Sequence, residues 1–220
     1  MNGKQCTFNE QCTQQQVGTV AGRTPSERRK TKTRQDILDA TYALILEHGV
    51  QGLSIRAIAD DIDYSPAALY RYFGSKDELV DAVRAQCFER LNAALRDAME
   101  NATGAFEQIL AAGMTYIEYA RQHPTDYHLM FHLPPSAATQ TENQQVAMSG
   151  LLYLVRYGIE TGVFVTSENY TEDTIMFHCW ATVHGLAMLQ TTVMQDNEAR
   201  IRASSEAILR KVIAGFTAAG

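Results

Sequence analysis

Apolar residues at helical spacing, interrupted by one tight turn, occupy residues 54–78. Ser54 is placed to cap a first short helix, whose predicted buried face is Ile55, Ile58, Ala59 and Ile62. Ser65 and Pro66 predict the start of a second helix, because proline has no N–H to leave unpaired there. Ser75 and Glu78 form a capping box that predicts a third helix. Two short helices in this arrangement are typical of the helix-turn-helix that binds in a DNA major groove.

The second predicted helix has two distinct faces. Leu69 and Phe73 are four residues apart, so they share a side and are expected to pack inward. The opposite, solvent-facing side is small and weakly charged, and consists of Ala67, Tyr70 and Arg71. Gly74 is expected to end this helix.

Helical spacing continues through most of the remaining chain. Glycine or proline interrupts it at Gly49, Gly104, Pro124 and Gly162. Long alternating runs of Val, Ile and Thr, which would indicate strands, do not occur. We therefore expect an all-α protein of about nine helices. They are the short pair within residues 54–74, one helix before it at 33–48, and others at 75–100, 105–122, 126–132, 142–161, 171–194 and 196–218.

The net charge of −6 is unevenly distributed along the chain. Residues 1–90 hold 12 basic and 12 acidic residues, whereas residues 91–220 hold 7 and 13. Six basic residues lie within residues 23–34, against Glu27 alone. Such a run suits a solvated linker, but before a helix-turn-helix it favours an arm that contacts the minor groove or the phosphates.

Several other classes of site receive little support. No run of about 18 apolar residues predicts a membrane span, no secretory signal is visible, and the four cysteines lack CxxC or zinc spacing. These features favour a protein that resides in a reducing cytoplasm. His128 and His132 are spaced i, i+4 like a metal-ligand pair, but without a further metal motif they favour surface or cavity-lining histidines. We therefore expect no metal and no cofactor.

Residues 34–83 resemble the DNA-binding domain of the TetR family of transcriptional regulators. The resemblance rests on Ile37-Leu-Asp-Ala40, on residues 44–49 and 54–59, and above all on Leu69-Tyr-Arg-Tyr-Phe-Gly-Ser-Lys76. One departure is Asp63, where the family usually has glycine in the turn. Aspartate tolerates a left-handed backbone better than most residues, so the turn is expected to survive.

The C-terminal half resembles the family's effector-binding and dimerisation domain more loosely, through residues 120–131 and 180–186. This likeness implies a homodimer whose last two long helices form a four-helix bundle, and a ligand cavity enclosed by the fifth to seventh helices. The expected domains are a disordered, Gln-rich tail ending in a basic arm (1–30), the helix-turn-helix domain (31–78) and a helical effector-binding and dimerisation domain (79–220).

The expected DNA contacts fall into two groups. Base contacts are assigned to the small residues at the start of the second helix, namely Ser65, Pro66, Ala67 and Ala68. Phosphate contacts are assigned to hydroxyl and basic side chains around it, of which Arg56 and Arg71 also suit guanine: Arg34, Ser54, Arg56, Tyr70, Arg71, Tyr72 and Lys76. Capping alone also explains Ser54, and core packing also explains one of Tyr70 and Tyr72.

The C-terminal half supplies the remaining candidates. The expected ligand-binding residues are mostly apolar with a few hydroxyls, and are Met114, Tyr116, Ile117, Tyr127, Met130, Phe131, Tyr153, Tyr157, Phe177 and Trp180. The expected dimer contacts are His184, Met188, Leu209 and Ile213. An ordinary helical core has a similar composition.

Together these features predict a transcriptional regulator, of the repressor type, that binds a palindromic double-stranded operator as a dimer and is released by a small apolar or aromatic molecule. A helical ligand-binding or scaffold protein that does not engage DNA is the alternative. An enzyme is disfavoured, because the chain lacks a phosphate-binding Gly-rich loop, a nucleophile elbow and a metal motif.

Overall fold

A computed structural model describes residues 24–133, 140–192 and 198–216. Within these residues the chain forms nine helices and no strand, as the sequence predicts. The helices are α2 (Pro25–Gly52), α3 (Ile55–Asp61), α4 (Pro66–Leu69), α5 (Lys76–Glu100), α6 (Ala105–Gln122), α7 (Pro124–Phe131), α8 (Gln140–Glu160), α9 (Glu172–Thr192) and α10 (Glu198–Gly215). None of these helices is long and apolar enough to cross a membrane.

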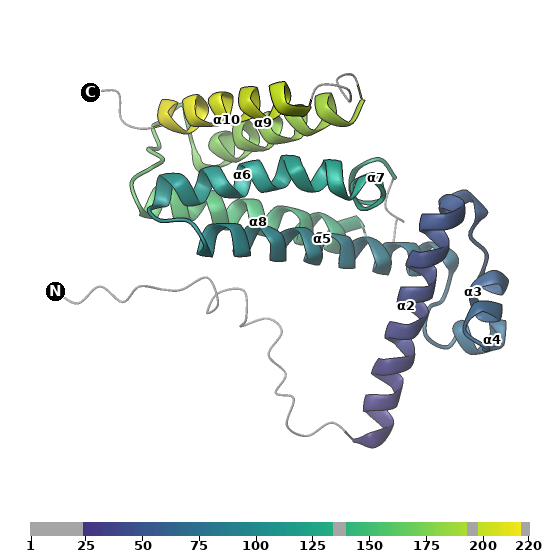
Figure 1. Cartoon of the computed structure of the whole chain (residues 1–220). Helices are drawn as coiled ribbons and strands as arrows, with labels where there is room; N and C mark the ends of the chain where they lie inside the picture. Colours follow the sequence, from purple (N-terminus) through teal and green to yellow (C-terminus); the bar gives the residue numbers. More distant parts are fainter. Residues whose placement is uncertain (1–23, 134–139, 193–197, 217–220) are drawn as a thin grey trace.

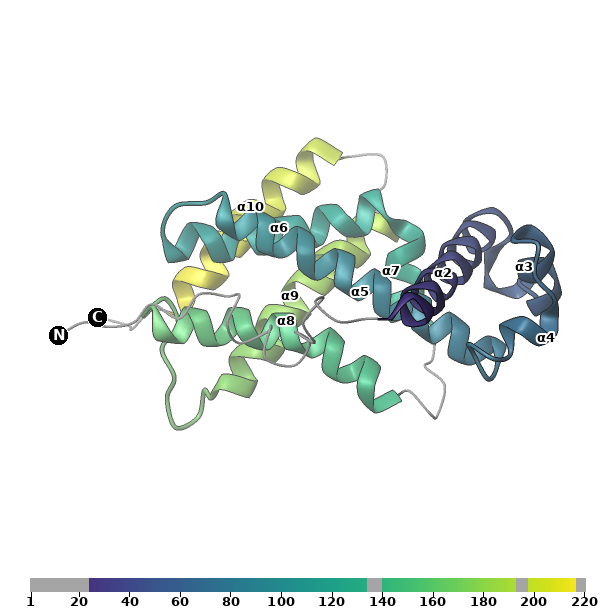
Figure 2. The same cartoon turned by 90° about the horizontal axis from the view of Figure 1, so that it is seen from below.

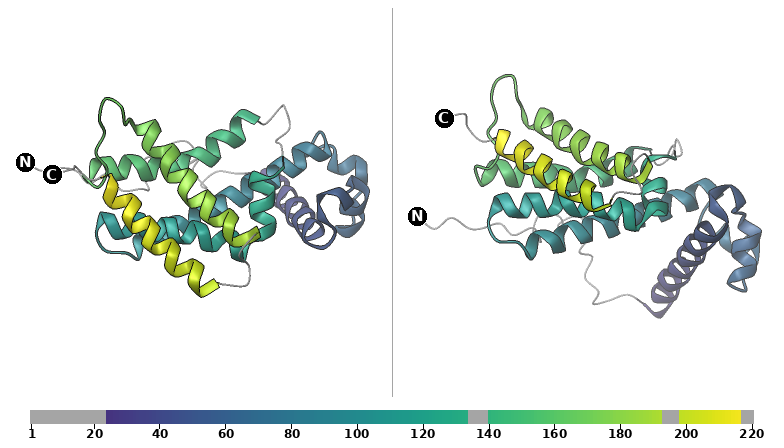
Figure 3. Two further views of the ribbon diagram at one scale, coloured as in Figure 1. Left: turned by 90° about the horizontal axis from the view of Figure 1, so that it is seen from above. Right: turned by 45° about the horizontal axis from the view of Figure 1, so that its top comes forward.

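The helices form two connected parts. Helices α2, α3 and α4 lie at one end of the molecule, and the long α5 leads from them into a bundle with α6 to α10 (Figure 1). The view from below shows the same separation (Figure 2). Helices α9 and α10 lie side by side on the outer face of the bundle, where both also contact α6 (Figure 3).

Helix α2 begins earlier than the sequence analysis predicts. Thr24 and Glu27 form a capping box, in which the Thr24 hydroxyl accepts from the Glu27 N–H and the Glu27 carboxylate accepts from the Thr24 N–H. Pro25 follows as the first helical residue. The prediction of a tail through residue 30 and a helix from 33 is therefore wrong for residues 25–32, whose basic side chains lie on a helix. Residues 1–23 lie outside the described chain.

The glycines predicted to interrupt the helices all have positive φ values, which glycine adopts without a Cβ clash. Gly104 (φ 86°) and Gly162 (φ 76°) lie in turns between helices, as predicted. Gly49 (φ 69°) only kinks α2, which continues to Gly52, so the predicted end of this helix at residue 48 is wrong. Asp63 has a φ of 57°, so it takes the left-handed conformation expected in the turn between α3 and α4. Helix α4 is shorter than predicted, because regular helix ends at Leu69 and residues 70–72 continue as turns before Gly74.

Two clusters of buried apolar side chains hold the molecule together. The first joins the helix-turn-helix to the bundle and includes Ile37, Leu38, Ile58, Leu69, Phe73, Leu79, Val83, Cys87, Tyr127 and Leu129. The second lies between α6, α8, α9 and α10. Helices α5 and α7 share the first cluster with α2 to α4, so one apolar core connects them to the helix-turn-helix. The predicted division between residues 78 and 79 falls inside α5 and stays a prediction.

Candidate DNA-binding surface and ligand cavity

Three serine caps set the geometry of the helix-turn-helix. The Ser54 hydroxyl accepts from the Ala57 N–H at 3.1 Å, and the Ser65 hydroxyl accepts from the Ala68 N–H at 3.2 Å. Ser75 caps α5 in the same way, but Glu78 accepts from the N–H of Gly74 rather than from that of Ser75. Each cap fixes the start of a helix and leaves the serine O–H proton available to an acceptor.

Three of the four predicted base-contacting residues are exposed in the structure, and the fourth is buried. Ser65, Pro66 and Ala67 are exposed on the outer side of α4, where nothing in the described protein covers them. Ala68 is instead buried, with 8% of its surface exposed. It follows Ala67 by about 100° around the helix, which turns it toward the core. This burial favours a packing role for its small side chain, and its assignment to base contact stays a prediction.

The two tyrosines after α4 also differ from each other. Tyr70 is 53% exposed, so its phenol is available to a phosphate. Tyr72 is half-buried and packs against the first core cluster, which supports core packing for one of the pair. Lys76, at the first position of α5, is half-buried.

Basic side chains extend this surface along α2. Arg28, Arg29 and Lys30 are exposed on its first turns. Arg34 is exposed too, and its guanidinium lies 4.8 Å from the centre of the Phe73 ring, a cation–π contact that ties α2 to the turn after α4. On α3, Arg56 is exposed and lies 4.0 Å from Asp60, a weak ion pair that a phosphate can replace.

An apolar cavity lies inside the bundle and is lined by residues of α5 to α10. It has a volume of about 90 Å³, and its lining includes the polar side chains of Asn92, Tyr116 and Thr182. Tyr116, Phe131 and Trp180 line it, as predicted for ligand-binding residues. Phe88, Leu91 and Ile109 line it as well, although they are not among the predicted ligand-binding residues.

Other predicted ligand-binding residues lie away from this cavity. Tyr127 and Met130 are buried in the first core cluster, while Met114 and Ile117 line a separate groove beside α10. Tyr153 lines a smaller adjoining pocket, and Tyr157 stacks on Tyr153 at 6.3 Å and donates to Gln108. Phe177 is 57% exposed on the outer face of α9. Its assignment to the cavity is wrong, because the inward face of α9 carries Trp180 and Val183 instead.

His184 belongs to the wall behind the cavity rather than to an exposed dimer surface. Its Nδ1 lies 3.1 Å from the Tyr116 hydroxyl and 2.8 Å from the Tyr127 hydroxyl. Burial, with a smaller effect of His132, lowers the pKa of His184, which favours the neutral ring. A neutral ring with its proton on Nε2 accepts through Nδ1. Burial also raises the pKa of Tyr127 to about 12.

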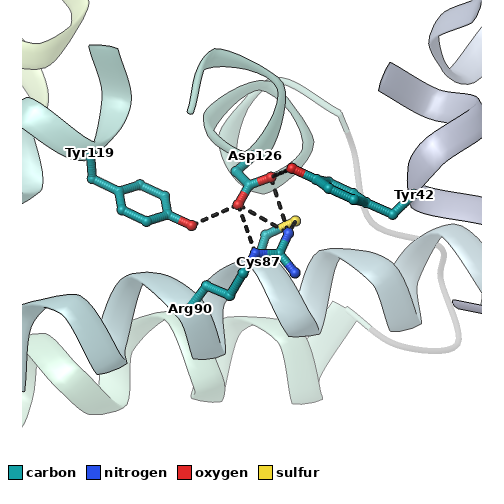
Figure 4. A network of polar contacts seen from close by, with 5 residues as sticks. All are labelled: Tyr42, Cys87, Arg90, Tyr119 and Asp126. Carbon is teal, nitrogen blue, oxygen red and sulfur yellow. Dashed lines mark hydrogen bonds and ion pairs between the residues drawn. The ribbon is translucent and has the colours of Figure 1, made fainter. Parts of the chain in front are cut away.

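A second polar network joins the helix-turn-helix to the bundle (Figure 4). The buried carboxylate of Asp126 on α7 accepts from Tyr42 on α2 at 2.5 Å and from Tyr119 on α6 at 2.6 Å. The guanidinium of Arg90 on α5 binds both carboxylate oxygens, at 3.0 and 3.1 Å. Burial raises the pKa of Asp126, but the hydrogen bonds and the Arg90 charge outweigh it and keep that pKa below its usual value. Four helices therefore meet at one carboxylate.

The predicted dimer contacts Leu209 and Ile213 are also placed differently. Each is 4% exposed, and both line the cavity from α10, so they pack within one subunit. Met188 is half-buried against the first core cluster. The helical period had correctly put Leu209 and Ile213 on one face of α10, but sequence alone did not show which face turns inward.

A different apolar surface remains exposed on α9 and α10. Residues four apart along α9 form an exposed row, namely Phe177, Ala181, Gly185 and Leu189. Ile208 on α10 is 42% exposed. A Cβ added at Gly185 would meet no atom within 4 Å, so another helix has room to approach closely. We refer to these five residues as the outer α9–α10 face.

Within the described parts of the chain, no group of three His, Cys, Asp or Glu residues is close enough to hold a metal ion. The rings of His128 and His132, the pair with metal-ligand spacing, stack at 5.4 Å.

The fold and these sites define an all-helical regulator with an N-terminal helix-turn-helix. Residues 37–83 match the model of the bacterial regulatory proteins of the tetR family, and residues 109–212 match the tetracyclin repressor-like C-terminal domain. The two matches together cover more than half of the chain. The chain therefore belongs to the TetR family of transcriptional regulators, a class of regulators rather than enzymes.

Individual relatives agree with this assignment. The HTH-type transcriptional regulator PksA of Bacillus subtilis is 25% identical over 161 residues, which are 71% of this chain and 78% of PksA. The HTH-type transcriptional repressor KstR of Rhodococcus jostii is 39% identical over 67 residues, which are 30% of this chain. The match spans only about a third of the length of KstR, 32%. A solved protein of unknown function from Rhodococcus sp. RHA1 has a TM-score of 0.71 at 25% identity, covering 92% of this chain and 100% of that one.

Proposed function

We propose that this protein is a dimeric transcriptional repressor that acts in the cytoplasm, binds a two-fold symmetric DNA operator and releases it when a small apolar molecule binds. The observation that carries the proposal is the capped helix-turn-helix, whose small exposed face at Ser65, Pro66 and Ala67 suits close contact with base edges. Exposed Tyr70 and the basic side chains of α2 supply phosphate contacts beside it.

Dimerisation through the outer α9–α10 face supports tight and specific binding. One helix-turn-helix buries little DNA surface, whereas a dimer places two recognition helices about 34–36 Å apart, one turn of DNA. An exposed row of apolar residues beside an exposed glycine is the kind of surface that a second helix pair covers.

Effector control would act through α5 and α7. The cavity of about 90 Å³ is smaller than the roughly 300–1,000 Å³ of pockets that enclose drug-sized ligands. A ligand of that size therefore has to displace α5, α8 or the side chains between them. Since α5 shares its core with the helix-turn-helix, such a displacement changes the spacing of the two recognition helices.

Fluorescence anisotropy with DNA from upstream of the gene tests this function. We expect salt-dependent binding, two subunits per operator, and loss of binding on addition of an apolar effector. If the protein binds this DNA no more tightly than DNA of unrelated sequence, it is instead a ligand-binding or scaffold protein. The cavity supports this second candidate, because a protein can bind a ligand there without binding DNA.

A further inference from the structure

We infer that the cavity takes an amphipathic ligand with an apolar body and one anionic oxygen head, and that Asn92 and Arg96 bind the head. The apolar cavity adjoins a smaller pocket between α5 and α8. The two share four lining residues, Asn92, Leu95, Gly150 and Leu154, so they are neighbouring compartments between α5 and α8. This inference rests on the proposed role of the cavity as an effector site.

The two compartments differ in chemistry. The larger one is lined mainly by aliphatic and aromatic side chains from six helices, α5 to α10. The smaller one adds Arg96, Met99, Ser149 and Tyr153 to the shared residues. No Asp or Glu lines either compartment among the residues that the structure describes. An anion is therefore favoured over a cation at this end of the cavity.

Asn92 stands at the junction of the two compartments. Its side-chain amide makes no hydrogen bond to any other residue in the described part of the chain, although the residue is half-buried. A Cβ at Gly150 would lie 2.4 Å from Asn92 Oδ1, so glycine at this position is what allows the amide to lie against α8. An amide beside an apolar cavity that has no partner among the described residues suits a polar group of a ligand.

Arg96 supplies the positive charge, and its five N–H donors let it bind a ligand beside the contact that it already makes within the protein. It follows Asn92 by four residues on α5, so both side chains project from the same face of the helix, one turn apart. A guanidinium binds a carboxylate through two parallel hydrogen bonds, and the Asn92 N–H₂ group donates one more. The cavity wall runs along α5 from Phe88 to this pair, eight residues or about 12 Å. A saturated carboxylate of about that length, such as decanoate, fits the arrangement.

Three probes with the same chain and different heads test the inference: decanoate, 1-decanol and decyltrimethylammonium. Trp180 is the single tryptophan of the chain and lines the cavity, so its emission reports binding of each probe without DNA. Because a hydrogen bond to a charged group contributes about 1.5–3 kcal/mol, we expect decanoate to bind roughly 10- to 100-fold more tightly than the other two. Equal affinities, or no binding of decanoate, would overturn the inference.

Variants then locate the head group. Arg96→Gln removes the charge and keeps most of the length, and we expect it to abolish the preference for decanoate while changing 1-decanol affinity less than about twofold. Asn92→Ala should reduce the preference in the same direction. Arg200→Gln, at an exposed arginine on α10, is the matched control and should leave all three affinities unchanged. A preference for decanoate that survives in both Arg96→Gln and Asn92→Ala would place the head group elsewhere and overturn the assignment.

The same titrations separate this inference from the proposed function. If decanoate binds with the expected preference but leaves operator affinity unchanged, the effector role fails and the head-group assignment stands. If another compound controls operator binding while decanoate does not bind, the repressor function stands and the head-group assignment is overturned.

Discussion

The hydroxyl of Tyr42 on α2 donates a 2.5 Å hydrogen bond to the Asp126 carboxylate on α7, joining residues 84 positions apart in the chain. Arg90 of α5 lies over the Tyr42 ring, 4.6 Å from its centre, and also binds Asp126. Hydrogen bonding to Asp126 and burial raise the pKa of Tyr42 to about 12, with burial the larger effect. The phenol thus remains a donor throughout the physiological pH range. The helix-turn-helix is attached in this way to α7 and α5, two of the helices that line the cavity.

Replacing this donor tests whether the attachment transmits the effect of a ligand. Tyr42→Phe keeps the ring and removes one hydrogen bond to a buried carboxylate. The free energy of unfolding, measured by urea denaturation, should therefore fall by about 1.5–3 kcal/mol. The factor by which an effector weakens operator binding should fall as well, because α7 and α2 can then move independently. Tyr64→Phe, at an exposed hydroxyl 3.5 Å from Thr33, is the matched control and should change neither quantity. An unchanged coupling factor in Tyr42→Phe would show that α5 transmits the signal without this hydrogen bond.

His184 predicts a pH dependence of stability. Its pKa in the folded state is lowered by burial, so near pH 6 the unfolded chain binds a proton that the folded protein does not. The contribution of neutral His184 is therefore fully present above its unfolded pKa of about 6.5 and is lost as the pH falls toward its folded pKa. We expect the free energy of unfolding to decline below about pH 6.5, and His184→Gln to reduce this decline. His48→Gln, at an exposed histidine, should keep the wild-type profile. Identical profiles for wild type and His184→Gln would contradict the role of burial.

The sequence predicts the local elements of this fold well. Caps and glycines are short-range signals, so Ser54, Ser65 and Gly104 mark helix boundaries without knowledge of the tertiary structure. The start of α2 was also readable, since Thr24-Pro25-Ser26-Glu27 is itself a capping box with proline at the first helical position. It was missed because the basic residues that follow it had been interpreted as an arm.

The location of the ligand and dimer residues was less predictable. Helical spacing shows that Leu209 and Ile213 share a face, but not whether that face meets α6 of the same subunit or another molecule. Phe177 and Trp180 are three residues apart on α9, yet one is exposed and the other lines the cavity. Neither the Asp126 network nor Asn92 leaves a sequence signal, because each depends on helices brought together only by the fold.

Lys76 tests how the protein docks on DNA. Its ammonium lies at the start of α5, beside the exposed turn that follows α4, so Lys76→Ala should weaken binding to every DNA sequence and reduce the slope of log K against log salt by about one. Substitution of Ala67 should instead change sequence preference. Lys211→Ala, at an exposed lysine on α10, is the control and should change neither affinity nor slope. Fluorescence anisotropy at several salt concentrations gives both quantities, and an unchanged slope in Lys76→Ala would exclude a phosphate contact.

The outer α9–α10 face gives the last prediction, which concerns the dimer. Phe177 and Ile208 are 57% and 42% exposed, whereas Leu209 lies inside the subunit beside the cavity. Phe177→Glu or Ile208→Glu places a charge on the outer face without disturbing the core, so we expect a folded monomer by light scattering at micromolar concentration and a large loss of operator affinity. Leu209→Ala removes buried contacts instead, and should destabilise the subunit by about 2–5 kcal/mol while the protein that remains folded stays dimeric. Because the two kinds of substitution affect different measurements, they separate the outer face from the core. A dimer that persists in both Phe177→Glu and Ile208→Glu would show that the subunits associate through another surface.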